Sequence, residues 1–221
     1  MPFARFMDLA LHHPEHGYYA KPEPVVGTEG DFLTSPALHP AFGRALWRQI
    51  DEMAGLLDAS KPVTVLEIGA GAGQMARDIL AAARAAGKAG SVRYLIREQS
   101  RRLRQQQAET IAASWADAPV AWVDSLEAAR PVQVVVMNEL MSALPVHRLI
   151  YEDGAWREIH VDVRDGALTL VPGPVTDPRA PAAVAQAGIE PRPGQVVDVN
   201  TAAADMLVRI AGCLDERAFI L

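Results

Sequence analysis

The stretch VTVLEIGAGAGQMARDIL, residues 63–80, limits the possible folds of this chain more than any other. An apolar run leads into three glycines, Gly69, Gly71 and Gly73, and an alanine-rich amphipathic segment follows. A buried strand that turns through glycines into a helix is typical of open α/β sheets, where the turn and the helix N-terminus approach a ligand. A tight turn that binds nothing is the alternative interpretation of such a cluster.

The alternation of apolar runs and helical segments continues after this stretch. Strands are predicted at 93–97, 120–123 and 132–137, and the last of these is apolar enough to be buried on both faces. Strands that alternate with helices predict an α/β fold with a parallel, doubly wound sheet. Before this sheet, a helix should end near Pro14, a loop should occupy 15–35, and a long helix should begin after Ser35 or at Pro40.

The pattern changes to period-2 alternation at about 147–171. Asp153-Gly154 and Asp165-Gly166 interrupt it and predict hairpin turns, hence an inserted antiparallel meander. Six prolines in 172–194 predict an irregular segment, and a strand near 196–199, a helix over 202–213 and a final strand should follow. We therefore divide the chain into an N-terminal helical and loop region, 1–62, that covers the site, and a core, 63–221, with an insertion at about 147–194. Because the chain ends within a strand, we expect a fragment whose last strand forms a sheet edge.

Composition excludes several classes of protein. The 221 residues carry a net charge of -6, which argues against a nucleic-acid partner. No apolar span is long enough for a membrane helix and no signal peptide is evident, so we expect no membrane partner. The single cysteine, Cys213, fits a reducing compartment, and a cytoplasmic location is predicted. His12, His13 and His16 suggest a metal site, but Pro14 interrupts their spacing and none is expected.

The residues around the glycines discriminate between ligands. The dinucleotide fingerprint requires a glycine where this chain has Gln74, and the Lys-Ser or Lys-Thr of a phosphate-binding loop is absent. What remains is a Glu-x-Gly-x-Gly-x-Gly pattern that begins at Glu67. A carboxylate there would repel a pyrophosphate and attract an ammonium group, which favours S-adenosylmethionine, with S-adenosylhomocysteine as product. Glu98, at the carboxyl end of the second strand, is the candidate to bind the ribose hydroxyls.

Further candidate residues follow the next two strands. Asp124 and Ser125, after the third strand, are placed to bind the adenine amine. Asn138 and Glu139 follow the fourth strand, beside the point where the strand order reverses. We predict that Asn138 lies near the methionine end of the cofactor and that Glu139 faces the methyl acceptor. The alternative is that Asn138 caps a turn and Glu139 is structural.

Several motifs occur together in an order that resembles the MidA family of S-adenosylmethionine-dependent methyltransferases, which includes a mitochondrial protein-arginine methyltransferase required for respiratory complex I assembly. The motifs, which cover nearly the whole chain, are HPEHGYY (13–19), GDFLTSP (30–36), AFG (41–43), LEIGAGAGQMARDIL (66–80), REQS (97–100), NELMSALPVHRL (138–149) and WREIHVDV (156–163).

The resemblance implies a Rossmann-like class I methyltransferase fold that continues past residue 221. It also implies that Gly69, Gly71, Gly73 and Glu98 hold the cofactor and that the loop 30–36, with Thr34 and Ser35, closes over it. A protein substrate, an arginine side chain of a respiratory complex I subunit, is implied in the same way.

The chain departs from the family pattern where acids are usual. Ala37, Arg44 and Ser142 stand at these positions, and alanines at 70 and 72 replace a usual proline and arginine. These changes predict retained cofactor binding with an acceptor other than arginine, or weak activity. They also favour an alternative function, a non-catalytic assembly or binding protein that keeps an adenosylmethionine pocket. An oxidoreductase is a third possibility, against which Gln74 argues.

Overall fold

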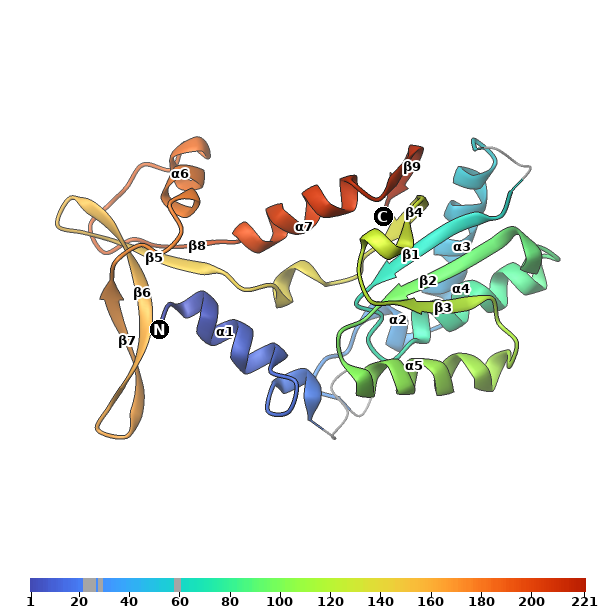
Figure 1. Cartoon of the computed structure of the whole chain (residues 1–221), viewed down its shortest axis with the longest axis horizontal. Helices are drawn as coiled ribbons and strands as arrows, with labels where there is room; N and C mark the ends of the chain where they lie inside the picture. The colour runs from blue at the N-terminus through green and yellow to red at the C-terminus, as the bar shows by residue number, and fades with distance from the viewer. Residues whose placement is uncertain (22–26, 28–29, 58–60) are drawn as a thin grey trace. The chain divides into compact units, whose positions relative to one another are not determined.

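The computed structural model describes residues 1–21, 27, 30–57 and 61–221. The chain forms two compact units, one composed of Tyr19–Leu140 with Arg209–Leu221 and the other of Met1–Tyr18 with Met141–Val208. The first contains a parallel sheet and the second an antiparallel sheet (Figure 1). This division differs from the one drawn from the sequence, because the first 18 residues belong to the same unit as the inserted meander.

The parallel sheet has five strands in the order β3-β2-β1-β4-β9, and every pair is parallel. Two helices, α4 (Gln74–Ala85) and α5 (Arg101–Ser114), connect its first three strands in turn. The order therefore reverses between β1 and β4, where ligands of open α/β sheets usually bind outside the carboxyl ends of the strands. The strands are β1 (Val63–Ile68), β2 (Val92–Arg97), β3 (Val120–Val123), β4 (Val132–Val136) and β9 (Leu214–Ile220).

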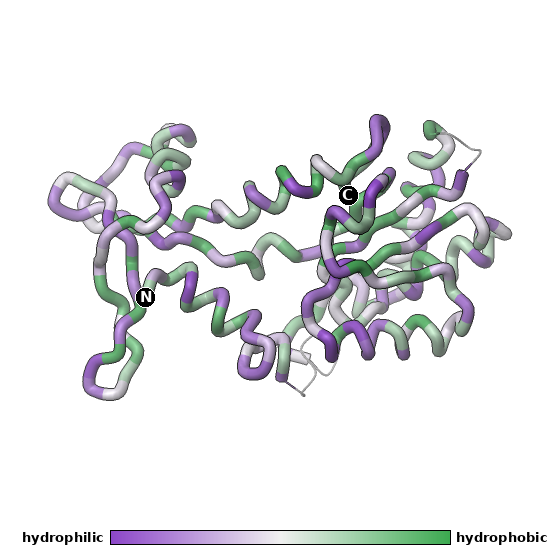
Figure 2. The backbone as a smooth tube through the Cα atoms, in the orientation of Figure 1, coloured by the Kyte–Doolittle hydropathy of each residue, from purple (hydrophilic) through white to green (hydrophobic). Residues whose placement is uncertain are grey.

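The central strands are buried on both faces, as their apolar runs predict. Val65, Tyr94 and Val134 lie side by side on β1, β2 and β4 and point into a core that α3 (Ala41–Ala54) and α4 close from one side. Leu66, directly next to Val65 in β1, is also fully buried and points to the opposite face. Figure 2 shows the hydrophobic strands of this sheet beside the more hydrophilic start of α5.

The N-terminal part of this unit resolves the two possible starts of the long helix. The short helix α2 (Ser35–Leu38) and the longer α3 both form, and Pro40 occupies the N-cap of α3. The loop predicted at 15–35 lies partly outside the described residues, which omit 22–26 and 28–29. Single 3₁₀ turns form at η1 (Tyr18–Ala20), η2 (Ala89–Ser91), η3 (Glu127–Ala129) and, in the other unit, η4 (Met141–Ala143).

The antiparallel unit confirms the predicted meander. Asp153 and Asp165 adopt φ angles of 53° and 52° and their following glycines 79° and 77°, the left-handed pairs that two-residue hairpin turns require. Helix α1 (Phe3–His12) contacts β5 and β6 of this sheet. The sheet has the order β7-β6-β5-β8, formed by β5 (His147–Glu152), β6 (Ala155–Arg164), β7 (Ala167–Gly173) and β8 (Val196–Val199).

The proline-rich segment contains more structure than expected. Helix α6 (Arg179–Gln186) forms within it, with Pro178 at the N-cap and Pro181 in the first turn. Prolines are tolerated there because the first backbone N–H groups of a helix have no partner within it. The expectation of a wholly irregular segment was therefore wrong at 179–186.

The C-terminal elements return to the parallel sheet. Helix α7 (Thr201–Ala211) leads into β9, which pairs with β4 and is the edge strand of the sheet. None of the helices in the described part of the chain has the length and apolar character needed to cross a membrane.

Candidate functional site

The three glycines form the turn between β1 and α4, at the carboxyl edge of the sheet. Gly69, Gly71 and Gly73 have φ angles of 72°, 54° and 87°, a backbone conformation that side chains disfavour. Gly73 is the N-cap of α4, so the N-terminus of this helix opens from the turn. The backbone N–H of Gly69 donates to the Arg97 carbonyl at 3.1 Å, which ties the turn to the end of β2.

Packing within the protein limits the space for a side chain at two of the glycines, and the limit is backbone at Gly73 but a side-chain end at Gly69. A methyl group at Gly73 would lie 2.9 Å from the Cα atom of Gln107, in α5. A methyl group at Gly69 would lie 2.9 Å from Cδ1 of Leu140, just after β4. The turn therefore packs between α5 and the segment that follows β4.

Glu98, the predicted ribose ligand, is held at both carboxylate oxygens. Its Oε1 accepts from the backbone N–H groups of Gln99 and Ser100 at 2.8 and 2.9 Å. Its Oε2 accepts from the side-chain amide of Gln107 at 3.2 Å. The side chain is only 8% exposed. A carboxylate has about four acceptor positions, so these three bonds leave capacity for a further donor.

Gln107 was not recognised as a site residue from the sequence. It is fully buried, and its Nε2 also donates to the Gly71 carbonyl at 2.9 Å. One signal was available, because Leu103, Gln107 and Ile111 follow each other at intervals of four, and the two apolar residues are buried. A glutamine on the buried face of an amphipathic helix must bond to protein groups.

Glu67 is buried in the core beneath the glycine turn. Tyr94 donates its hydroxyl to Oε2 of Glu67 at 2.7 Å, while Oε1 has no partner among the described residues. Burial raises the pKa of Glu67 to about 7, and the charge of Glu98 adds to the rise against the opposing hydrogen bond from Tyr94. An acceptor oxygen with no donor is costly in a buried position, and a cationic ligand group would satisfy it.

The residues predicted to bind adenine have other partners. The carboxylate of Asp124 is almost fully exposed and accepts from Arg104 Nη1 at 2.8 Å. Arg104 also donates from Nε to the Glu98 carbonyl at 2.8 Å, so Asp124 is linked to the end of β2 through this arginine. The hydroxyl of Ser125 accepts from the N–H of Ala128, in the η3 turn, at 3.2 Å.

Asn138 and Glu139 follow β4, separated from its last residue by Met137. Asn138 is half-buried and Glu139 is exposed. Glu139 has a φ of 54°, outside the hairpin context that explains the positive φ of Asp153 and Asp165. A residue other than glycine held in the left-handed region stores strain, and such residues cluster at functional sites.

The loop predicted to close over the cofactor contains Thr34 and Ser35. Thr34 is the N-cap residue of α2 and its carbonyl accepts from two amides of that helix, while Ser35 is exposed at the helix start. In the described part of the chain, neither side chain bonds to the other predicted site residues, and neither does Ser125. Gln107 thus links Glu98 to Gly71 by hydrogen bonds, and Arg104 links Glu98 to Asp124. Gly69 is connected to the segment after β4 by packing.

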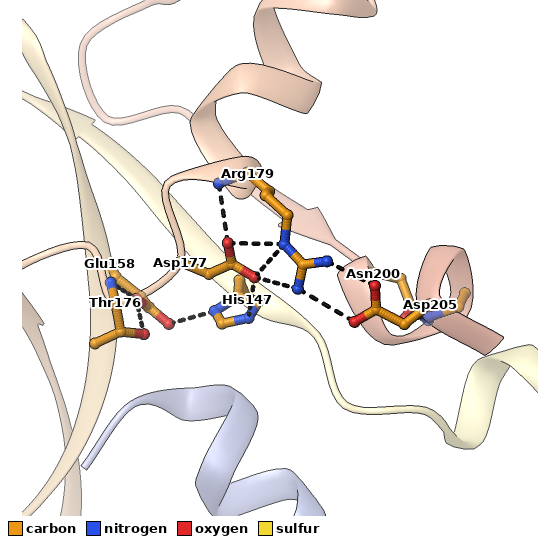
Figure 3. Close-up of polar contacts among 8 residues, drawn as sticks. His147, Glu158, Thr176, Asp177, Arg179, Asn200 and Asp205 are labelled. Atoms are coloured by element: carbon orange, nitrogen blue, oxygen red, sulfur yellow. Dashed lines mark hydrogen bonds and ion pairs between the residues drawn. The ribbon is translucent and has the colours of Figure 1, made fainter. Parts of the chain in front are cut away.

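A second polar cluster lies in the antiparallel unit (Figure 3). The fully buried Glu158 accepts from His147 Nδ1 at 2.8 Å and from both the N–H and hydroxyl of Thr176 at 2.6 Å. Arg179 bonds Asp177 and Asp205, which joins the start of α6 to α7. Every one of these charged groups has a protein partner, so the cluster connects the elements of this unit. Within the described residues, no group of three or more His, Cys, Asp or Glu is placed to hold a metal ion.

Comparison with known proteins decides which ligand chemistry applies. Residues 43–221 match the Methyltransf_28 family, whose description is "Putative S-adenosyl-L-methionine-dependent methyltransferase". The chain belongs to this methyltransferase family. The match confirms the resemblance to S-adenosylmethionine-dependent methyltransferases that the sequence motifs indicated. S-adenosylmethionine is the cofactor of the family.

Curated relatives of the family are longer than this chain. The Danio rerio protein named "Protein arginine methyltransferase NDUFAF7, mitochondrial" is 30% identical over 184 residues, which cover 72% of this chain and 43% of the relative. Its Drosophila melanogaster homolog is 29% identical over 188 residues, covering 76% and 43%. The chain thus spans less than half the length of these relatives.

Solved structures confirm the fold class. A Burkholderia thailandensis protein crystallised with S-adenosyl-homocysteine is 32% identical, with a TM-score of 0.84 over 97% of this chain and 55% of that one. A second structure from the same organism gives 33% identity and a TM-score of 0.78. The chain therefore has the Rossmann-like fold of class I methyltransferases, as predicted.

Proposed function

We propose that this chain is an S-adenosylmethionine-dependent methyltransferase whose cofactor site is the carboxyl edge of β1 and β2. The observation that carries the proposal is a pair of buried carboxylates, Glu67 and Glu98, at the ends of these adjacent strands beside the glycine turn. Glu67 has a buried oxygen without a donor, which fits the ammonium group of the cofactor. Glu98 is oriented by its neighbours and keeps one acceptor position, which fits a ribose hydroxyl.

The bound cofactor would supply a methyl group on a sulfonium, which is already activated for transfer. The protein then has to align the acceptor and remove its proton. Glu139 is the candidate for this role, because it is exposed at the end of β4 and held in a strained conformation. Asn138, next to it, is the candidate contact for the methionine end. Both assignments rest on position in the fold and on the resemblance of the NEL motif.

For the acceptor, we propose a protein side chain, and arginine in particular. The support is that relatives at about 30% identity are named protein arginine methyltransferases. A respiratory complex I subunit, the substrate implied by the family resemblance, is the first protein to test. A cytoplasmic location belongs to the same proposal, on the grounds of composition. Ala37, Arg44 and Ser142 stand where the family usually has acids. They predict that transfer to arginine is weak, and an acceptor other than arginine is the alternative if no methylarginine forms.

The non-catalytic alternative keeps the same pocket and lacks transfer. The two are separated by incubating the protein with labelled S-adenosylmethionine and either purified respiratory complex I or an arginine-rich peptide, followed by analysis for methylarginine. Labelled methylarginine supports the enzyme; cofactor binding without transfer to any protein or peptide acceptor supports the alternative.

Cofactor binding itself is tested by calorimetry with S-adenosylhomocysteine. We expect Glu98→Ala to weaken the affinity roughly tenfold to a hundredfold, because a buried acceptor for a ribose hydroxyl is lost. Glu109→Ala is the matched control, since Glu109 is an exposed carboxylate of α5 that bonds only Gln105 among the described residues. Equal affinity of the wild type and Glu98→Ala would remove Glu98 from the site.

A further inference from the structure

Gln107 connects three parts of the parallel-sheet unit with one side-chain amide. Its Nε2 donates to Gly71 O at 2.9 Å and to Glu98 Oε2 at 3.2 Å. Its Oε1 accepts from Nε1 of Trp122, in β3, at 2.8 Å. The residue is fully buried, so these three bonds account for most of its hydrogen-bonding capacity.

Trp122 determines which way the amide faces. The indole N–H can only donate, so the carbonyl oxygen of Gln107 must point toward it. The opposite orientation would set the amide N–H₂ against this donor, and would set the amide oxygen against two acceptors, Gly71 O and Glu98 Oε2. The donor side is therefore fixed toward the glycine turn and the carboxylate.

The position of Gln107 is fixed by backbone packing as well. Its Cα atom lies where a side chain at Gly73 would have to be, so α5 approaches the turn as closely as glycine permits. A small shift of this helix would move the amide relative to Glu98. The bond to Trp122 and the packing of α5 thus hold the neutral amide of Gln107 in one orientation against the carboxylate of Glu98.

We propose that Gln107 is a positioning residue for the ribose end of the cofactor, acting through Glu98. With Oε1 of Glu98 bonded to two backbone amides and Oε2 bonded to Gln107, the carboxylate is held in one orientation and one acceptor position, on Oε2, remains. A neutral amide does this without changing the charge of Glu98. A glutamate at 107 would place a second carboxylate in contact with the first. This inference rests on the proposed function, because it concerns how that site is oriented.

The test compares Gln107→Met, which keeps the length of the side chain, with Gln105→Met, the same change at an exposed position of the same helix. Calorimetry measures the affinity for S-adenosylhomocysteine and for its analogue that lacks both ribose hydroxyls. The affinity for S-adenosylhomocysteine divided by the affinity for this dideoxy analogue is the ribose ratio, and it reports the contact with the ribose hydroxyls alone. We expect Gln107→Met to reduce this ratio about tenfold with little change for the dideoxy analogue, and Gln105→Met to leave both affinities unchanged.

The outcomes separate this inference from the function on which it depends. In the Glu98→Ala background, Gln107→Met should have no further effect on the ratio, because the carboxylate that it orients is gone. An equal loss of affinity for both ligands, or an unchanged ratio in the Gln107 variant, would show that Gln107 only packs. Failure of the wild type to bind S-adenosylhomocysteine would overturn the proposed function, and this inference with it.

A second variant protects the test if Gln107→Met does not fold. Gln107→Glu keeps an acceptor for Trp122 and places a carboxyl group against Glu98. Its ribose ratio should be low at about pH 8 and should recover toward about pH 5.5, where the new carboxyl group binds a proton and can donate it. A ratio equal to that of the wild type at both pH values would contradict the positioning role.

Discussion

Leu140 occupies the space that a side chain at Gly69 would need, with its Cδ1 atom 2.9 Å from the position of a methyl group there. The end of β1 is thereby packed against the residue that follows Glu139. We expect Gly69→Ala to lower the free energy of unfolding by about 1–3 kcal/mol, because the φ of 72° is strained for alanine and Leu140 must move. Urea denaturation measures this change.

Gly87→Ala is the matched control for this prediction. Gly87 has nearly the same φ, 71°, but a methyl group there would meet nothing within 4 Å. It therefore reports the cost of the backbone conformation alone. Measured against the Leu140→Ala single variant, the cost of adding Gly69→Ala should fall to the cost of Gly87→Ala in the wild type. If it stays larger, the contact with Leu140 is not the cause.

Glu67 makes the stability of the free protein depend on pH. Its pKa is about 7 in the folded protein and near 4.5 in the unfolded chain, so the folded state holds a proton that the unfolded state releases between these values. Stability should therefore fall as pH rises from about 4.5 to 7 and level off above. Glu67→Gln should be more stable than the wild type at about pH 8, by about 2–4 kcal/mol at most, and similar to it near pH 4.5. Urea denaturation at both pH values measures the difference.

The same carboxylate should link cofactor binding to proton release. If the cofactor ammonium pairs with Glu67, binding favours the ionised form, and affinity for S-adenosylhomocysteine should rise between about pH 6 and pH 7.5. The number of protons released is measured by calorimetry in buffers of different ionisation enthalpy. Glu67→Gln should bind more weakly and lose this pH dependence, and a wild-type affinity that is flat with pH would place the ammonium elsewhere.

Much of the fold follows from local sequence patterns. The strand runs, the glycine turn and the Asp-Gly hairpins each depend on residues close together in the chain, and the structure contains all of them. The partners of Gln107 could not be predicted in this way, because Gly71, Glu98 and Trp122 come from three other elements. The packing at Gly69 likewise depends on Leu140, which lies far from it in the sequence. Helix α6 was missed because its prolines lie only at its start, where they do no harm.

The polar cluster of the antiparallel unit should respond to acid. Hydrogen bonds from Arg179 lower the pKa of Asp177 to about 2, so the ionised carboxylate contributes stability above the unfolded pKa of about 3.9 that is lost as pH falls through 2. Asp177→Asn should lower the melting temperature at about pH 7, and the difference should shrink near pH 2. Asp162→Asn is the control, since the Asp162 carboxylate is exposed and paired with Arg164 at 3.5 Å.

Strain at Glu139 provides the final test of its role. Its φ of 54° is better tolerated by glycine than by alanine, so Glu139→Gly should be more stable than Glu139→Ala by about 1 kcal/mol. Asp165, with a φ of 52° in an exposed hairpin turn, offers the same pair of substitutions away from the site. The two sites should show the same difference in urea denaturation. Methyl transfer should be lost in both Glu139 variants and in Glu139→Gln, with affinity for S-adenosylhomocysteine retained, and should be kept in both Asp165 variants. If Glu139→Gln transfers methyl groups at the wild-type rate, the carboxylate has no part in proton removal and the strain at this position serves only the turn.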